Sequence, residues 1–325
     1  MESELKLRKQ SKSTKEIQKN EKPPTNQVNE QPKIPQLKYG PMPKFSGQRI
    51  FSRAVIIVAV LIYVWYYPKN GKEVILAQSG DVYTNRGVNV NCDKAYLEEI
   101  KSYSGCVPKK CGRFVMDRLV TEYEADILLW LAKRGMSLAE SSGGATIMDL
   151  HSGALSYKTT FINFYKSGKD NFITPTDLLV YRTVRERIQA AIAETFGLDG
   201  TKLYLTYPTF FSKLTNKEPA HVHDEYWHVH VDKFTYESFH YTSLVYLNNY
   251  RQDFQGGRFL YLENTAKSKH NMTVEPRKGR VSFFTSGAEN PHFVEKVTEG
   301  ERFAITISFT CDESKKIKDL EKSLK

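Results

Sequence analysis

The chain has 325 residues, of which 40% are apolar and 12% aromatic, so it can bury the core of one large domain or two small ones. Its formal net charge is +10, but residues 1–49 hold eleven Lys and Arg against five Asp and Glu, a surplus of six. A nucleic-acid partner needs a basic surface on the folded part of the chain, and this distribution argues against one.

Residues 1–49 are rich in Lys, Pro, Gln and Asn and poor in large apolar residues, which is typical of a disordered tail. Residues 50–67 follow as a stretch that is apolar apart from Ser52 and Arg53 and ends in a Trp/Tyr cluster. Its length is near the lower limit for a membrane-spanning helix, and Arg53 can extend its charge to the interface.

The basic tail fixes the expected orientation of this segment. By the positive-inside rule the tail is cytosolic, residues 50–67 are a single-pass type II signal anchor, and residues 68–325 lie in the lumen of the endoplasmic reticulum or Golgi. A cleaved signal peptide is disfavoured, because about fifty residues precede the apolar stretch and no small-residue cleavage site follows. A buried core segment is the remaining alternative.

The cysteines agree with a lumenal location. All four follow the anchor, three of them in residues 68–113, which we interpret as a lumenal stem: Cys92, Cys106, Cys111 and Cys311. An even number on the side where disulfides form favours a disulfide framework. Zinc binding by Cys106 and Cys111 is less favoured, because no second pair follows at finger spacing. The sequon at Asn271 predicts a glycosylation site.

Two helices are predicted next. Residues 115–136 place apolar side chains on one helical face, with Gly135 as a stop. In the second helix, either Thr174 or Thr176 caps the start, Pro175 suits the first turn, and Gly197 ends it.

From residue 202 onward the pattern changes to short β-branched and aromatic runs separated by turn residues. The runs are "LYLTYPTFF", "WHVHVDKF", "YTSLVYLNNY", "RFLYLE", "MTVEP", "RVSFFTS", "HFVEKV" and "RFAITISFT". Such strands after two helices predict a sandwich, barrel or jelly roll with helices packed outside, an α+β fold. We place this domain at residues 114–312, its core at 200–312, and a charged tail at 313–325.

The run "WHVHVD" carries the strongest chemical signal. It alternates, so in an extended strand His228, His230 and Asp232 share one face. His228 and Asp232 would then be about 13 Å apart, too far to share one metal ion. Two pairs stay possible, His228/His230 and His230/Asp232. The alternative is a set of strand histidines that only form hydrogen bonds.

A third ligand has to come from another strand. One imidazole and one carboxylate supply two-thirds of the 2-His-1-carboxylate triad of non-haem Fe(II) enzymes. Downstream histidines are His240, His270 and His292, of which His292 begins a predicted strand. Ten residues later, Arg302 begins the alternating run "RFAITISF". An arginine inside a barrel needs an anion, and its planar fork suits a carboxylate.

With these motifs in this order, residues 200–312 resemble the prolyl 4-hydroxylase-type Fe(II)/2-oxoglutarate dioxygenases. The matching segments are "HVDKF", "YTSLVYLNNY", "GGRFLYLE", "VEPRKGRVSFF" and "HFVEKVTEGERFAITISF". The resemblance implies a double-stranded β-helix (jelly roll) with supporting helices. Two features depart from the family: Arg302 stands where many members have Lys, and no Pro follows soon after His292.

The resemblance also assigns roles. It implies that His230, Asp232 and His292 bind Fe(II), that Arg302 holds the distal carboxylate of 2-oxoglutarate, and that Tyr246 adds a hydrogen bond there. Fe(II), 2-oxoglutarate and O2 are the expected cofactor and co-substrates, with ascorbate a further candidate. The expected reaction hydroxylates a C–H bond, of the prolyl type in a protein or peptide substrate, and releases succinate and CO2.

Two other functions were weighed. A Golgi glycosyltransferase would share the type II topology, but the chain has no D-x-D motif for a nucleotide-sugar metal. A catalytically silent jelly-roll binding module in the secretory lumen could keep every one of these residues for structural reasons. His223 and His228 receive no role from the resemblance.

Overall fold

The computed structural model describes residues 47–66, 73–265 and 268–320. These residues divide into two units, of which the first holds helix α1 (Gln48–Tyr66) up to Tyr63 and the second runs from Val64 onward. Within the described ranges no helix combines the length and the apolarity that crossing a membrane requires, so the transmembrane helix expected over residues 50–67 is not found. The predicted disordered tail, residues 1–49, lies almost wholly outside the described residues.

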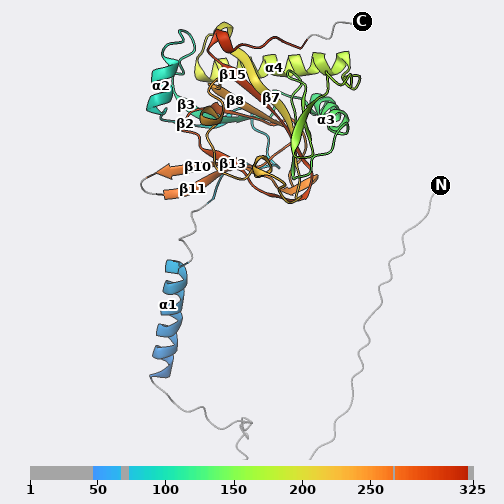
Figure 1. Ribbon diagram of the computed structural model, residues 1–325. Coiled ribbons are helices and arrows are strands. Elements are labelled where there is room, and N and C mark those ends of the chain that lie inside the picture. Colours follow the sequence, from blue (N-terminus) through green and yellow to red (C-terminus); the bar gives the residue numbers. More distant parts are fainter. Residues whose placement is uncertain (1–46, 67–72, 266–267, 321–325) are drawn as a thin grey trace, which may run out of the picture. The chain divides into compact units, whose positions relative to one another are not determined.

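The second unit is built on two facing sheets (Figure 1). The large sheet has the strand order β2 (Arg86–Val90), β3 (Cys111–Met116), β12 (Val281–Thr285), β8 (Tyr241–Tyr246), β15 (Arg302–Thr310), β7 (Tyr204–Leu214), β4 (Ala145–Met148), β5 (Ala154–Tyr157), β6 (Thr160–Asn163). The small sheet has the order β1 (Val74–Ala77), β11 (Ser268–Val274), β10 (Phe259–Thr265), β13 (His292–Val294). A two-stranded ribbon joins β14 (Val297–Gly300) to β9 (Phe254–Gly256).

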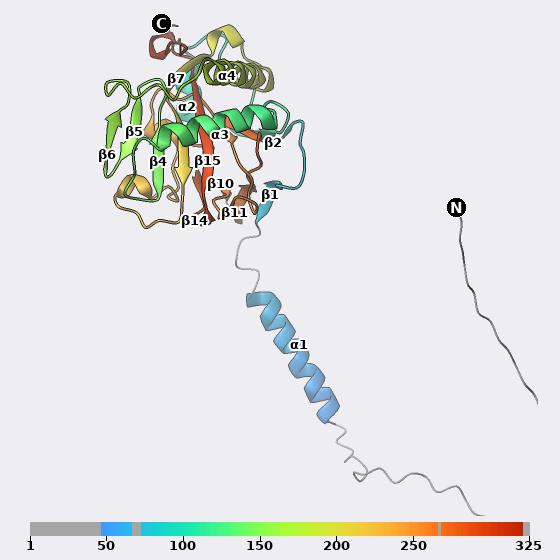
Figure 2. The ribbon, with the colours of Figure 1, turned by 90° about the vertical axis from the view of Figure 1, so that its right-hand side faces the viewer.

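Two long helices, α3 (Glu122–Met136) and α4 (Pro175–Phe196), cover the outer face of the large sheet (Figure 2). Helix α4 begins and ends as predicted: the Thr174 side chain caps it in a capping box, and Gly197 adopts a left-handed conformation at its end. The predicted start of the first helix is wrong. Val115 belongs to β3, where it pairs with β12, and α3 begins only after the Thr121 cap.

The short helices were not predicted. They are α2 (Lys94–Ile100), α5 (Asp232–Thr235) and the 3-10 turns η2 (Gly200–Lys202), η3 (Val222–Asp224) and η4 (Glu313–Lys315). The described part of the charged C-terminal segment packs on the domain, because Arg185 Nη2 of α4 donates to both carboxylate oxygens of Asp319.

Two cores result. The outer core lies between the helices and the large sheet. The inner core lies between the two sheets and takes aromatic residues from both, among them Tyr246 of β8, Phe284 of β12, and Phe259 and Tyr261 of β10. This is the jelly-roll-like arrangement that the strand pattern and the family resemblance predict.

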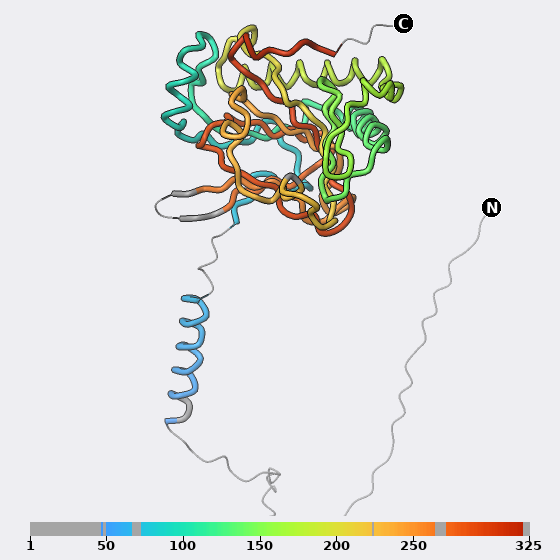
Figure 3. The backbone as a smooth tube through the Cα atoms, viewed as in Figure 1, coloured from blue at the N-terminus to red at the C-terminus, as the bar shows by residue number. Residues whose placement is uncertain are grey.

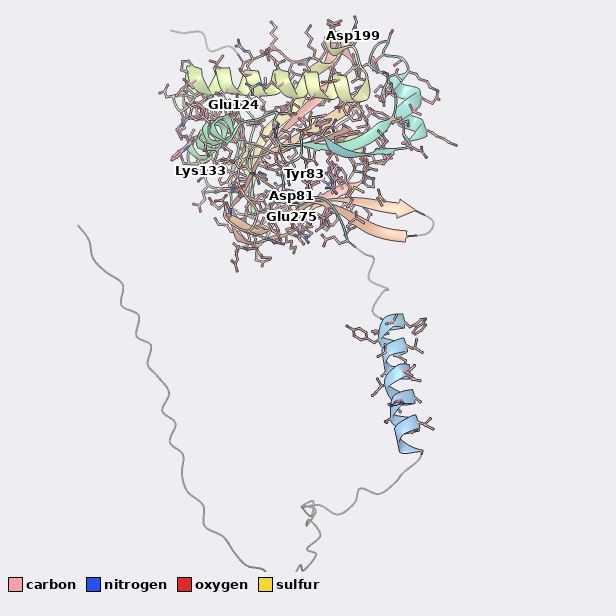
Figure 4. All side chains as sticks on the ribbon, turned by 180° about the vertical axis from the view of Figure 1, so that it is seen from behind. Asp81, Tyr83, Glu124, Lys133, Asp199 and Glu275 are labelled. Carbon is pink, nitrogen blue, oxygen red and sulfur yellow. A yellow bond between two sulfur atoms is a disulfide. The ribbon has the colours of Figure 1, made fainter. Side chains whose placement is uncertain are left out.

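Residues that we expected to form a stem contribute to both sheets. Figure 3 traces the chain from the small sheet, where β1 pairs with β11, into the large one, where β2 and β3 extend the β12 edge. Asp81, Tyr83 and Glu275 lie close together (Figure 4), and the buried Arg280 donates to the backbone carbonyls of Asp81 and Glu275.

The cysteines form the predicted disulfide framework. Cys92 is bonded to Cys111, and Cys106 to Cys311. The second bond ties the segment before β3 to the end of β15, across 205 residues of chain. No cysteine in the described part of the chain is left for a metal.

Candidate metal centre

The run "HDEYWHVHVD" is not the strand that its alternation predicts. η3 is followed by irregular backbone, a single bridge residue at His230, and α5 beginning at Asp232. The Asp224 side chain accepts hydrogen bonds from the backbone N–H groups of Ala220 and His221, which favours a turn. The Tyr226 hydroxyl donates to the Thr215 carbonyl and accepts from the Val297 N–H, so it ties this loop to the ends of β7 and β14.

His230, Asp232 and His292 nevertheless meet at one point. His230 and His292 exchange two backbone hydrogen bonds, of 2.9 and 3.0 Å, as an isolated antiparallel bridge. Asp232 Oδ1 lies 3.5 Å from His292 Nε2 and 3.7 Å from His230 Nε2. One ligand atom from each residue lies within 4.8 Å of the others, so the three can hold a single metal ion.

Hydrogen bonds fix the orientation of both imidazoles. His230 Nδ1–H donates to the carbonyl of His228 at 3.0 Å, and His292 Nδ1–H donates to the carbonyl of Asn290 at 2.9 Å. These donations assign the proton to Nδ1 and leave Nε2 with a free lone pair on the side of Asp232. Backbone carbonyls commonly fix metal-binding histidines in this way.

The electrostatics favour the ligating protonation states. Burial, and next the charge of His292, lower the pKa of His230, which favours the neutral imidazole. Burial alone would raise the pKa of Asp232, but the neighbouring polar groups, His292 first, outweigh it and the pKa lies below its usual value. In the described part of the chain, the buried Asp232 Oδ2 has no hydrogen-bond partner. A cation bound to this carboxylate would satisfy it.

Arg302 lies at the start of β15 with 1% of its surface exposed. Its Nε–H donates to the carbonyl of Gly257 at 2.8 Å, and its guanidinium carbon lies 5.4 Å from the centroid of the Tyr246 ring. Burial lowers the pKa of Arg302. Its buried Nη2 finds no hydrogen-bond partner within the described ranges, so the site has a donor for an anion.

Two carboxylates near Arg302 in sequence, Glu295 and Glu301, are engaged elsewhere. Glu295 accepts two hydrogen bonds from Arg258, and Glu301 faces Lys213 Nζ at 3.5 Å. Among the residues that the structure describes, Arg302 has no ion-pair partner. A purely structural ion pair therefore does not explain this buried charge.

Gly256 and Gly257 lie between two of the predicted strands. Both glycines have positive φ, and a Cβ on Gly257 would lie 2.9 Å from Arg302 Cδ. The absence of a side chain lets the Gly257 carbonyl reach the guanidinium. The double glycine before the strand "RFLYLE" was the available signal, but its tertiary neighbour is not visible in the sequence.

The other histidines with described side chains have partners of their own. His228 Nε2 contacts Glu225 at 2.6 Å, and His151 Nε2 contacts the Tyr181 hydroxyl at 2.8 Å. His240 lies between Glu99 and Thr310, and burial lowers its pKa to about 4. The side chains of His223 and His270 lie outside the described part of the structure.

Comparison with known proteins identifies relatives of this arrangement. Residues 219–310 match the model of the 2OG-Fe(II) oxygenase superfamily. The chain is 48% identical over 267 residues to 2-oxoglutarate and iron-dependent oxygenase domain-containing protein 3 of Homo sapiens, with 81% of this chain and 82% of the relative covered. The Xenopus tropicalis protein of the same name is 50% identical over 248 residues, covering 75% and 77%. Prolyl 3-hydroxylase 1 of Homo sapiens is 30% identical over 217 residues, covering 62% and 28%.

The geometry decides between the two pairs that the sequence left open, because the His228 ring contacts Glu225 and His230 faces Asp232. We expect His230→Ala to weaken Mn(II) binding at least about 100-fold, because losing even an outer-shell partner costs 10–100-fold. His228→Ala should cost less than about tenfold, since His228 supports His230 through its backbone carbonyl, which alanine keeps. Calorimetric titration of the metal-free protein measures both. Equal losses from the two substitutions would contradict the assignment.

Proposed function

The chain belongs to the 2OG-Fe(II) oxygenase superfamily, and on that premise we propose that it hydroxylates a C–H bond of a protein side chain. It is an enzyme whose family uses Fe(II), 2-oxoglutarate and O2. The observation that carries the assignment of the site is the convergence of His230, Asp232 and His292. When bound, the iron and its co-substrates supply the oxidant, and 2-oxoglutarate leaves as succinate and CO2.

The protein's own residues hold and orient the metal and the co-substrate. His230 and His292 present lone pairs whose direction is fixed by the carbonyls behind them, and Asp232 presents the negative charge. Arg302 holds the distal carboxylate of the co-substrate with the donors that it does not use within the protein. The Tyr246 ring packs against that guanidinium and its hydroxyl contacts the Ser282 hydroxyl at 3.3 Å. We propose that the Tyr246 hydroxyl adds a hydrogen bond to the same carboxylate.

A protein substrate of the prolyl type is supported by two observations. One is the likeness to a protein named prolyl 3-hydroxylase 1. The other is the apolar surface beside the metal ligands, where Val229 is 50% exposed and Phe234 is 73% exposed. His230 itself has 43% of its side chain exposed, so the metal is approached from this side. Exposed apolar side chains around a reactive centre suit contact with a polypeptide.

We also propose that the domain works in the secretory lumen, attached to the membrane by the N-terminal segment with its basic tail in the cytosol. Two disulfides support an oxidising compartment, because such bonds persist outside the cytosol. The Asn271 sequon, in β11, supports it further. Helix α1 does not meet the criterion for a span, so the anchor rests on the uncharged stretch and its basic flank.

Turnover separates an enzyme from a silent binding module. We expect the full-length protein with Fe(II), ascorbate and O2 to convert 2-oxoglutarate to succinate, and His292→Ala to lose this activity to background because one ligand is gone. Succinate is measured by chromatography. If wild type and His292→Ala produce equal succinate, the binding-module alternative is favoured.

Arg302→Ala should weaken 2-oxoglutarate binding at least about tenfold. A hydrogen bond to a charged group contributes roughly 1.5–3 kcal/mol, and 1.4 kcal/mol is a factor of ten. Arg302→Lys should keep part of the affinity, since it keeps the charge but loses the planar fork. Calorimetry with Mn(II)-loaded protein measures both, and Mn(II) affinity without co-substrate serves as the control that should not change. Binding within twofold of wild type in Arg302→Ala would contradict the co-substrate role.

The proposed membrane orientation can be tested with sealed microsomes. Protease added to sealed microsomes should shorten the chain by only about the first 50 residues, those that the positive-inside rule places outside. Glycosidase should shift the mobility of the wild type but not that of Asn271→Gln, which serves as the matched control. Digestion of the C-terminal domain in intact vesicles would reverse the proposed orientation, and carbonate extraction of the full-length chain would exclude a membrane anchor.

A further inference from the structure

Tyr261 of β10 is fully buried, with 0% of its surface exposed. In the part of the chain that the structure describes, its hydroxyl has no hydrogen-bond partner. Buried tyrosine hydroxyls normally have one, so this donor points to a ligand that the protein itself does not supply.

The ring cannot turn away to find another partner. The rings of Phe259, Phe284 and His292 lie 5.0, 5.4 and 6.2 Å from it, centroid to centroid. The guanidinium carbon of Arg113 lies over the Tyr261 ring, 4.8 Å from its centroid. Arg113 is itself buried and donates to Glu263 at 2.9 Å, so this cation is held in place. The phenol therefore has a fixed direction.

Tyr261 projects into the interior that the candidate metal centre borders. Tyr261 and His292 are directly paired in the register of β10 and β13, so both side chains project from the same side of the small sheet. Arg302 approaches the same interior from the large sheet, against Tyr246. Buried donors that lack a described partner thus come from both sheets: Tyr261 Oη from the small one, and Arg302 Nη2, Arg113 Nε and Arg113 Nη1 from the large one.

A phenol hydroxyl carries one proton that it can donate in a hydrogen bond. A protonated hydroxyl with no other partner favours an anionic acceptor. The co-substrate has two carboxylates, of which Arg302 accounts for one.

We propose that the Tyr261 hydroxyl donates a hydrogen bond to the carboxylate of 2-oxoglutarate that lies on the metal side, next to the oxo group. Arg113 is the positioning residue that holds the phenol for this contact. The inference rests on the proposed function and adds a second protein contact to the co-substrate, at the end opposite Arg302.

Tyr261→Phe tests this directly, because it removes one hydroxyl and keeps the ring. Full-length protein loaded with Mn(II), which does not turn over, is titrated calorimetrically with 2-oxoglutarate. We expect the Kd to rise about tenfold or more, while Tm stays equal or increases because the lost hydroxyl had no partner in the protein. Titration with 2-oxovalerate, which lacks the distal carboxylate, should show the same factor.

Tyr241→Phe is the matched control. The Tyr241 hydroxyl is buried in the outer core and donates to the carbonyl of Cys106 at 2.9 Å, so its removal should lower Tm and leave the Kd unchanged. An unchanged Kd in Tyr261→Phe would overturn the proposal. A loss seen with 2-oxoglutarate but not with 2-oxovalerate would move the contact to the distal carboxylate and overturn it as well.

The same titrations distinguish two further ways in which the proposal could fail. If Tyr261→Phe weakens Mn(II) itself by the same factor, the hydroxyl serves the Asp232 carboxylate and the co-substrate contact is wrong. If wild-type protein does not bind 2-oxoglutarate, the proposed function fails independently of Tyr261, and this inference fails with it.

Discussion

The pair of backbone hydrogen bonds between His230 and His292 is the interaction on which the candidate site depends. One residue lies in an irregular loop and the other begins β13, 62 positions later in the sequence. A single bridge fixes both Cα positions at once, and Asp232 follows two residues later at the start of α5. Without it, the loop would be held to the barrel only through contacts such as those of Tyr226.

The interior next to this bridge is built at a cost to the stability of the empty protein. Asp232 Oδ2, Arg302 Nη2 and the Tyr261 hydroxyl are all buried without a partner among the described residues. Each such atom typically costs about 1–3 kcal/mol. Since a metal ion and a dicarboxylate would satisfy them, ligand binding removes this cost and the polar groups need no reorganisation to receive the ligands. The unpaired atoms are thus better understood as prepared contacts than as packing defects.

The sequence predicts those parts whose signals are local. Alternating β-branched runs place β7, β8, β12 and β15, and a Thr-Pro start with a Gly stop places α4. It misses β4 to β6, whose strands of four residues carry too little periodicity. His230 and Asp232 were paired for a reason that is partly wrong, because the expected strand is a bridge residue followed by a helix turn. The pairing still holds, because residues two positions apart lie close together both in a strand and at the start of a helical turn. The contacts of Gly257 and Tyr261 depend on chain segments far away in sequence, and no local pattern reveals them.

The segment before residue 114 shows why a boundary at that residue does not describe the folding unit. Glu73 accepts a hydrogen bond from Thr273 and forms an ion pair with Arg258, which in turn holds Glu295 just beyond β13. β1 also covers the edge of β11, which would otherwise present unpaired backbone groups. The strand that begins with His292 is therefore braced by residues that composition alone would assign to a linker. Because the Cys106–Cys311 bond joins the same N-terminal region to the end of β15, which begins with Arg302, both strands that carry the candidate site are tied to it.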